Sequence, residues 1–153
     1  VQALAGEFGA LIIEDAAHCI EGQAAGRRIG TTADFTCFSF YATKNLTTGE
    51  GGMLVTDDPE VADRARLMSL HGISRNAWNR YSAAGSWFYE IEDVGYKYNM
   101  TDMQAALGLS QLQRIEANLW RREMIWSQYD EQTAVDGIRV FVRRDGLPGA
   151  DGG

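Results

Sequence analysis

The chain has 153 residues, enough for one domain with a hydrophobic core. Hydrophobic residues make up 45% of it, which is typical of a globular protein and excludes an intrinsically disordered one. Acidic residues outnumber basic ones by 21 to 14, and this balance argues against nucleic acid as a partner, because phosphate backbones attract basic surfaces. The sequence has no apolar run of about 18 residues and no visible signal peptide, so we expect no membrane span and a cytoplasmic protein.

The few cysteines and histidines limit the metal and disulfide chemistry that the chain can perform. Cys19 and Cys37 lack the CxxC spacing of a zinc or redox site, and we expect both to be reduced and buried. His18 and His71 are the only histidines, which is too few for a His-rich metal cluster. We therefore predict no metal site.

The first part of the chain is predicted to contain a helix and three short strands. We expect the helix over residues 1–8 and a buried strand over 11–15 that ends in two carboxylates. Residues 35–40 are rich in aromatic side chains and predict a second buried strand, and residues 53–56 predict a third. A loop with several glycines is expected between the first two strands.

Helices dominate the prediction for the second part. Asp58 as N-cap and Pro59 at the first helical position predict a helix to about residue 70. Thr101 and Gln104 have the spacing of a capping box, which predicts a helix that continues, with a bend, to about residue 129. Its expected apolar face consists of Ala105, Leu109, Leu112, Ile115 and Leu119. A further strand is expected over 138–142, and strands that alternate with helices indicate an α/β fold.

Only two residues in this chain could form an imine with an aldehyde. Of the 14 basic residues 12 are arginines, which leaves Lys44 and Lys97. Arginine cannot lose its proton in a protein, so it cannot form a Schiff base. Lys44 lies between a predicted strand and a glycine turn at 48–52, at the strand edge where open α/β sheets bind ligands. A lysine in such a place, taken alone, is more often a solvated surface charge.

Three other side chains near the predicted strand ends have two interpretations each. Asp15 is either the cap of a helical turn or a carboxylate that points into a ligand crevice. His18 is either a buried structural histidine or the neighbour of a ring-shaped ligand. Ser39 is either a small residue in a tight place or a hydroxyl donor to a phosphate. The glycine turn at 48–52 does not have the GxxxxGK[ST] order of a phosphate-binding loop.

Several motifs taken together resemble the DegT/DnrJ/StrS family of sugar aminotransferases. They follow one another in order over residues 1–135. The strongest are EDAAH at 14–18, FSFYATKN at 38–45 and TGEGG at 48–52, with further matches at 70–72, 95–102, 104–106, 111–112 and 121–123.

The resemblance implies both a fold and a domain organisation. The fold is an α/β one, part of the large domain that binds pyridoxal 5′-phosphate (PLP) in enzymes of the aspartate-aminotransferase type, and it ends in long helices. Residues 1–135 are then a portion of that large domain with the start of the connection to the small domain. Residues 136–153 are expected to be a truncated, flexible C-terminal segment.

The resemblance also implies the roles of five residues. Lys44 is expected to hold PLP as an imine and to move the substrate proton. Asp15 is expected to pair with the pyridine nitrogen, His18 to lie against the ring and Ser39 to bind the phosphate. Asn99 matches an asparagine that reaches the phosphate in the partner subunit, so a homodimer is expected.

The implied reaction is the PLP-dependent transfer of an amino group from an amino acid, expected to be glutamate, to a nucleotide-linked keto sugar. Such an enzyme serves polysaccharide biosynthesis. The form GYKYN at 95–99 is most similar to members that aminate 4-keto pentoses or deoxyhexoses.

Three alternatives remain to be weighed against this interpretation. A sugar dehydratase relative would have histidine in place of the Schiff-base lysine, and Lys44 argues against it. A non-catalytic or incomplete module of the same fold, acting in binding or regulation, is the second. A Rossmann nucleotide-binding domain is the third, and the absence of a G-x-G-x-x-G turn argues against it.

Overall fold

The computed structural model describes residues 1–73 and 90–133. These residues form helices and strands in mixed order, which agrees with the predicted α/β class. In chain order the elements are α1 (Gln2–Phe8), β1 (Ile13–Asp15), β2 (Gln23–Ala24), β3 (Arg27–Arg28), β4 (Phe35–Ser39), β5 (Gly52–Val55), α2 (Pro59–Ser69), α3 (Asp102–Leu112) and α4 (Ile115–Thr133).

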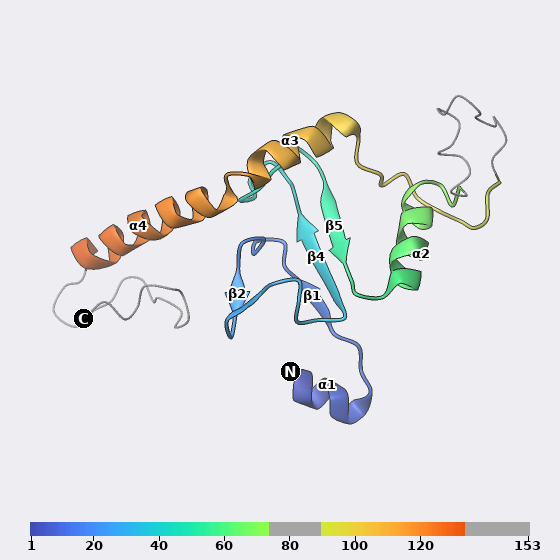
Figure 1. The fold of residues 1–153 in the computed structure, drawn as a ribbon, viewed down its shortest axis with the longest axis horizontal. Helices are drawn as coiled ribbons and strands as arrows, with labels where there is room; N and C mark the ends of the chain where they lie inside the picture. The colour runs from blue at the N-terminus through green and yellow to red at the C-terminus, as the bar shows by residue number, and fades with distance from the viewer. Residues whose placement is uncertain (74–89, 134–153) are drawn as a thin grey trace.

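Three of the strands form one sheet in the order β1-β4-β5. Strands β1 and β4 are parallel, and Asp15 at the end of β1 lies opposite Cys37. Strand β5 returns antiparallel to β4, with Ser39 opposite Gly52. Because β1 and β4 run in the same direction, the segments that follow Asp15 and Ser39 leave the sheet on one side, which we call the carboxyl edge (Figure 1).

A second, two-stranded sheet occupies the segment that was expected to be a glycine-rich loop. Strands β2 and β3 pair antiparallel, with Ala24 opposite Arg27. The two residues between them, Ala25 and Gly26, have φ angles of 50° and 73°. Positive φ at both central residues is the requirement of the tight turn that joins hairpin strands. The sequence signal for a hairpin was weak because alanine rarely adopts this conformation.

The helix starts agree with the predictions. Asp58 caps α2, since its side chain accepts from the backbone N–H groups of Glu60 and Val61. The capping box of Thr101 and Gln104 is present at the start of α3. The expected bend is a break, because α3 ends at residue 112 and α4 begins at residue 115. Helix α3 and the start of α4 lie across the carboxyl edge, and α1 lies beyond the opposite end of the sheet (Figure 1).

The hydrophobic core is small and lies at the carboxyl edge. Phe40, Leu46 and Ile115 are buried in it, and Ile20, Phe38 and Met100 pack against it. Phe40 and Leu46 come from the segment that links β4 to β5, so the core lies directly beneath the loop that carries Lys44.

Several expectations about burial were wrong. Cys19 and Cys37 are free cysteines, but both are exposed. Ile13 in the first strand is 72% exposed, although the strand was expected to be buried. Leu109 and Leu112 are exposed as well. The face that α3 turns toward the protein also includes the half-buried Gln104, Gly108 and Gln111, so it is more polar than predicted. Of the predicted apolar face, Ile115 is buried in the core, and Ala105 and Leu119 are half-buried.

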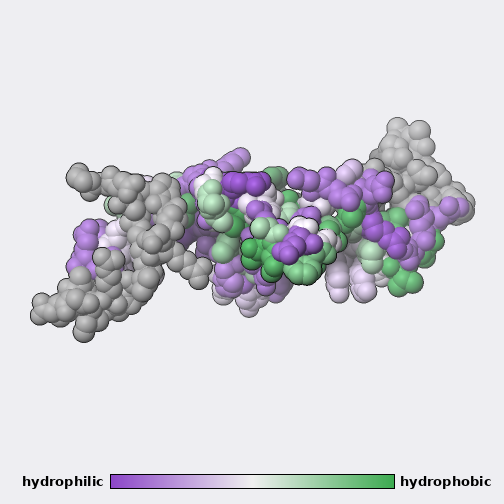
Figure 2. Space-filling view, turned by 90° about the horizontal axis from the view of Figure 1, so that it is seen from below, coloured by the Kyte–Doolittle hydropathy of each residue, from purple (hydrophilic) through white to green (hydrophobic). Residues whose placement is uncertain are grey.

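The predictions of a strand at 138–142 and of a truncated segment over 136–153 fall outside the described residues. On the described surface, apolar patches alternate with hydrophilic ones when the molecule is viewed from the α1 end (Figure 2). None of the described helices is both long enough and apolar enough to cross a membrane.

Candidate functional site

The loop between β4 and β5, residues 40–51, closes on itself at its base. The backbone N–H of Phe40 donates to the carbonyl of Gly51 at 2.8 Å, and the N–H of Thr48 donates to the carbonyl of Phe40 at 2.9 Å. The side chain of Thr47 reinforces this closure by donating to the same Phe40 carbonyl at 3.1 Å. These bonds hold both ends of the loop together, and Lys44 lies between them.

Helix α3 holds the second half of the loop with two glutamine side chains. Gln111 accepts from the Thr47 N–H at 3.2 Å and donates to the Thr47 carbonyl at 2.6 Å, so one amide satisfies both backbone groups. Gln104 donates to the carbonyl of Glu50 at 2.9 Å. The loop is therefore fixed to the helix by hydrogen bonds between groups that are distant in sequence.

Glycine is required where this loop returns to the sheet. A Cβ atom on Gly51 would overlap Oγ1 of Thr48, and Gly49 adopts a φ of 81°. The hydroxyl of Thr48 in turn donates to the carbonyl of Glu50 at 2.8 Å. The TGEGG sequence thus makes a turn in which only glycine fits at residue 51.

The structure brings two of the predicted site residues into direct contact. The Nζ atom of Lys44 lies 2.7 Å from Nε2 of His18, although 26 residues separate them in sequence. Lys44 is half-buried and His18 is exposed. The backbone of Lys44 is fixed by its N–H, which donates to the carbonyl of Tyr41 at 3.0 Å. The amine and the imidazole therefore meet at the carboxyl edge of the sheet.

Asp15 and Ser39 lie at the same edge, at the ends of the paired strands β1 and β4. Oδ1 of Asp15 accepts from the N–H of Ala17 at 3.0 Å, which is the bond of a capped turn. Asp15 is nevertheless exposed, so its carboxylate caps a turn and faces outward at once. The hydroxyl of Ser39 accepts a long bond of 3.4 Å from the N–H of Tyr41.

Asn99 stands apart from this cluster. Its Oδ1 accepts from Nζ of Lys97 at 2.5 Å, and its Nδ2 donates to the Met100 carbonyl at 3.5 Å. Within residues 1–73 and 90–133, no hydrogen bond joins Asn99 to Lys44, Asp15, His18 or Ser39. Four of the five predicted residues thus share one edge of the sheet, and the fifth does not contact them.

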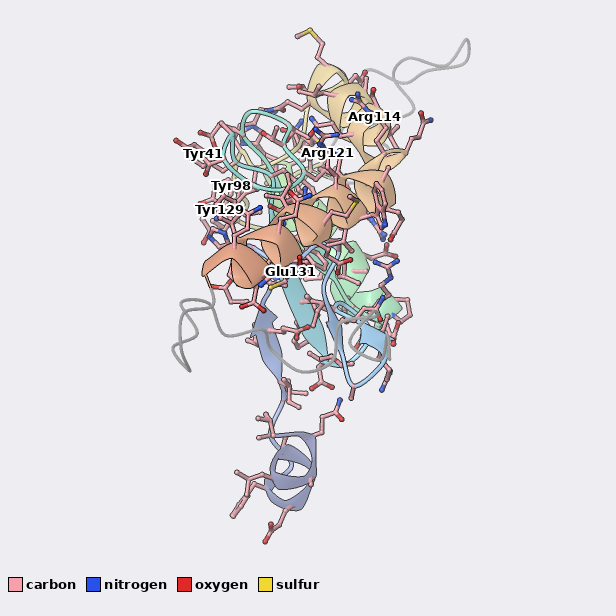
Figure 3. All side chains as sticks on the ribbon, turned by 90° about the vertical axis from the view of Figure 1, so that its left-hand side faces the viewer. Tyr41, Tyr98, Arg114, Arg121, Tyr129 and Glu131 are labelled. Carbon is pink, nitrogen blue, oxygen red and sulfur yellow. The ribbon has the colours of Figure 1, made fainter. Side chains whose placement is uncertain are left out.

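Exposed aromatic rings flank the two segments that carry Lys44 and Asn99. Tyr41 precedes Lys44 by three residues, and Tyr98 directly precedes Asn99. Both rings lie on the same flank of the molecule, opposite Arg114, in the view toward the end of α4 (Figure 3). Tyr98 also stacks on Tyr96, with ring centroids 5.0 Å apart.

Sequence reasoning missed one residue next to this cluster. Glu21 is only 5% exposed, which is unusual for a carboxylate. Its Oε1 accepts from Nδ2 of Asn45 at 2.8 Å and pairs closely with the guanidinium of Arg122 on α4. No local sequence pattern marks Glu21, because its partners lie 24 and 101 residues away. The described residues contain no group of three or more His, Cys, Asp or Glu side chains that could hold a metal ion.

Comparison with known proteins gives consistent results. The model of the DegT/DnrJ/EryC1/StrS aminotransferase family matches residues 1–143. The spore coat polysaccharide biosynthesis protein SpsC of Bacillus subtilis is 54% identical over 150 residues, which cover 95% of this chain and 38% of SpsC. The uncharacterized protein MJ1066 of Methanocaldococcus jannaschii is 54% identical over 129 residues, or 84% of this chain and 33% of that protein.

Two solved structures extend the comparison to the fold. The putative sugar aminotransferase Spr1654 from Streptococcus pneumoniae, in its PMP form, has a TM-score of 0.74 at 39% identity over 86% of this chain and 34% of its own. The Helicobacter pylori aminotransferase PseC has a TM-score of 0.80 at 28% identity, over 90% of this chain and 35% of its own. The chain therefore spans only about a third of the length of the relatives that it matches.

Proposed function

We propose, because this chain belongs to the DegT/DnrJ/EryC1/StrS aminotransferase family, that the protein carrying it transfers an amino group from an amino acid to a nucleotide-linked keto sugar. Glutamate is the expected donor. Aminotransferases of this family use PLP, and Spr1654 has been solved in PLP and PMP forms. We further propose a homodimer that works in the cytoplasm.

The names of the relatives support a sugar as the acceptor. Spr1654 is titled a putative sugar aminotransferase, and PseC is an aminotransferase involved in the biosynthesis of pseudoaminic acid. SpsC is named for polysaccharide biosynthesis. The nucleotide carrier and the glutamate donor rest on the resemblance of the motifs alone.

The side chains at the carboxyl edge fit the chemistry of PLP. An amine, Lys44, would link to the aldehyde, and a carboxylate, Asp15, would pair with the protonated ring nitrogen. The hydroxyl of Ser39 would donate to the phosphate and His18 would lie against the ring. Bound there, PLP supplies an electron sink for the electron pair that remains when the substrate loses a proton.

Lys44 is the residue that we assign to proton transfer. Its Nζ is the one amine at this edge among the described residues, and a positioned amine serves as both general base and general acid. Nε2 of His18, at 2.7 Å, offers Nζ a hydrogen-bond partner and orients it. Asp15 would keep the ring nitrogen protonated by offering it a carboxylate oxygen.

Asn99 motivates the proposal of a homodimer. It is half-buried, and it does not contact the Lys44 cluster within the described residues. We propose that it reaches the cofactor phosphate in the site of a second copy. This proposal predicts that Asn99→Ala lowers the affinity for PLP, while Lys44 still forms its link to the cofactor.

The contact between Lys44 and His18 is the observation on which the proposal chiefly rests, because it joins the ends of two segments that the parallel strands bring to one edge. The test compares the same replacement, lysine by arginine, at two positions of the full-length protein. Lys44→Arg keeps the charge but removes the amine, and it should abolish both the visible absorption band of lysine-linked PLP and transaminase activity.

Lys97→Arg is the matched control, since Lys97 is the only other lysine of this sequence. Arginine can still donate to Asn99, so this variant should keep the band and the activity. A wild-type protein that shows no band with PLP, or a Lys44→Arg variant that keeps it, would refute the proposal.

A further inference from the structure

The buried carboxylate of Glu21 connects three segments around the proposed site. It lies three residues after His18, in the segment that follows β1. Its Oε1 accepts from Asn45, the residue next to Lys44, and it pairs with Arg122 of α4. Nη1 of Arg28, from the β2–β3 hairpin, donates to its backbone carbonyl at 3.2 Å.

Two bridges therefore span the gap between the segments that follow β1 and β4. One joins His18 to Lys44 at 2.7 Å, and the other joins Glu21 to Asn45 at 2.8 Å. Both bridges connect the same two segments, and the first residue of each belongs to the β1 side. The second bridge is the better sheltered, because Glu21 is 5% exposed.

The environment of Glu21 makes its partners important. A buried carboxylate is stable only when it is paired and hydrogen-bonded. Its second oxygen, Oε2, is also buried and has no hydrogen-bond partner among the described residues. Asn45 and Arg122 thus carry the whole described compensation of this charge at Oε1, which favours one arrangement of the two segments.

We propose that Glu21 is a positioning residue, which sets the distance between Lys44 and the segment carrying Asp15 and His18 by holding Asn45 against α4. The proposal rests on the proposed function, since it assigns Glu21 a part in the geometry of PLP binding. Glu21 acts through Asn45 and touches no cofactor itself.

The test measures PLP affinity in the full-length protein by titrating the visible band. Glu21→Ala removes the bridge, and it should weaken PLP binding by about tenfold or more, because Lys44 then loses part of the fixed geometry with which it meets the cofactor. A displacement of about 1 Å can lower a reaction rate by about a hundredfold, so the activity should fall as well. Asn45→Ala should weaken it similarly. The double variant should bind PLP within about twofold of whichever single variant binds it less tightly, since both changes remove the same bridge.

Glu21→Gln provides a rescue, because the amide oxygen of glutamine still accepts from Asn45. This variant should bind PLP within about threefold of the wild type. If Glu21→Ala does not fold, Asn45→Ala and Glu21→Gln decide the matter, because Asn45 is exposed and its loss leaves the pair with Arg122 in place.

Glu116→Ala is the matched control. Glu116 pairs with Arg28, so it links the same hairpin to the same helix α4 without touching Asn45. It should leave the band and the PLP affinity unchanged. The inference is overturned if Glu21→Ala binds PLP as Glu116→Ala does, or if the effects of Glu21→Ala and Asn45→Ala add. A wild-type protein without the band overturns the proposed function and this inference together.

Discussion

The loop over residues 40–51 and the N-terminal part formed by α1 and β1 are built in opposite ways. In the loop, Phe40, Leu46 and Thr48 are each about 5% exposed or less, and glutamines from α3 bind its backbone. In the N-terminal part α1 has no buried residue, and Phe8 and Ile13 are more than 70% exposed. The described residues thus complete the packing of the loop but not that of the N-terminal part.

This difference separates what the chain organises by itself from what it leaves uncovered. A functional side chain is most accurately placed when the residues around it are locked by packing and hydrogen bonds. The loop that carries Lys44 has both, and its residues Phe40 and Leu46 form the core together with Ile115 of α4. The N-terminal part contributes mainly strand β1, whose end sets the position of Asp15. Substitutions in the loop should therefore lower the free energy of unfolding more than similar ones in α1.

The largest difference is expected between two glycine substitutions. Gly51→Ala places a methyl group against Oγ1 of Thr48, and it should lower the free energy of unfolding by about 1–3 kcal/mol, which is typical of overpacking. Gly6→Ala meets nothing within 4 Å in α1, and it should be neutral or stabilise by up to about 1 kcal/mol through helix propensity. Urea unfolding of the full-length variants measures both.

Gly51→Ala should also weaken PLP binding, because residue 51 closes the loop that carries Lys44. Equal effects of the two substitutions on stability would show that the loop is no more tightly packed than α1. A Gly51→Ala variant with unchanged stability would show that Thr48 moves aside without cost.

The next largest difference is expected between two glutamine substitutions, one of them in the glutamine that links α3 to the loop. Gln111→Ala removes both bonds to the backbone of Thr47, and it should lower the free energy of unfolding by about 1–3 kcal/mol, since partly buried groups lose their partner. Gln113→Ala is the control, because Gln113 is exposed and lies just beyond the end of α3. Thermal unfolding of the two variants gives the comparison, and a control that is as unstable as Gln111→Ala would contradict the role of the link.

Local signals in the sequence predicted the elements around the site well. Asp58 with Pro59, and Thr101 with Gln104, mark helix starts through bonds within three residues, and both caps are present. The apolar and aromatic runs predicted the bounds of the three strands of the sheet to within two residues. The positions of Asp15 and Ser39 at the strand ends followed from these predicted strands.

The remainder depends on partners that no local pattern reveals. The apolar stripe of α3 was predicted to face inward, but the helix turns Gln111 toward Thr47 because backbone groups of the loop need partners. Glu21 was missed for the same reason, since its burial depends on Arg122 in a distant helix. Contact between Lys44 and His18 required knowledge of the strand order, which the motifs imply only through family resemblance.

The smallest effect is expected at a helix cap that lies away from the site. Asp58→Ala removes the acceptor for the N–H groups of Glu60 and Val61, 2.9 and 3.1 Å away, and it should lower the free energy of unfolding by about 1 kcal/mol. The adjacent Asp57→Ala changes the net charge equally without removing a cap, so it should be close to neutral. PLP affinity should stay within about twofold of the wild type in both variants, since the Asp58 carboxylate bonds to backbone groups of the first turn of α2 itself. A marked loss of PLP affinity in Asp58→Ala would show that the loop depends on α2 as well as on α3, and the contrast between the well-packed loop and the rest of the described residues would then fail.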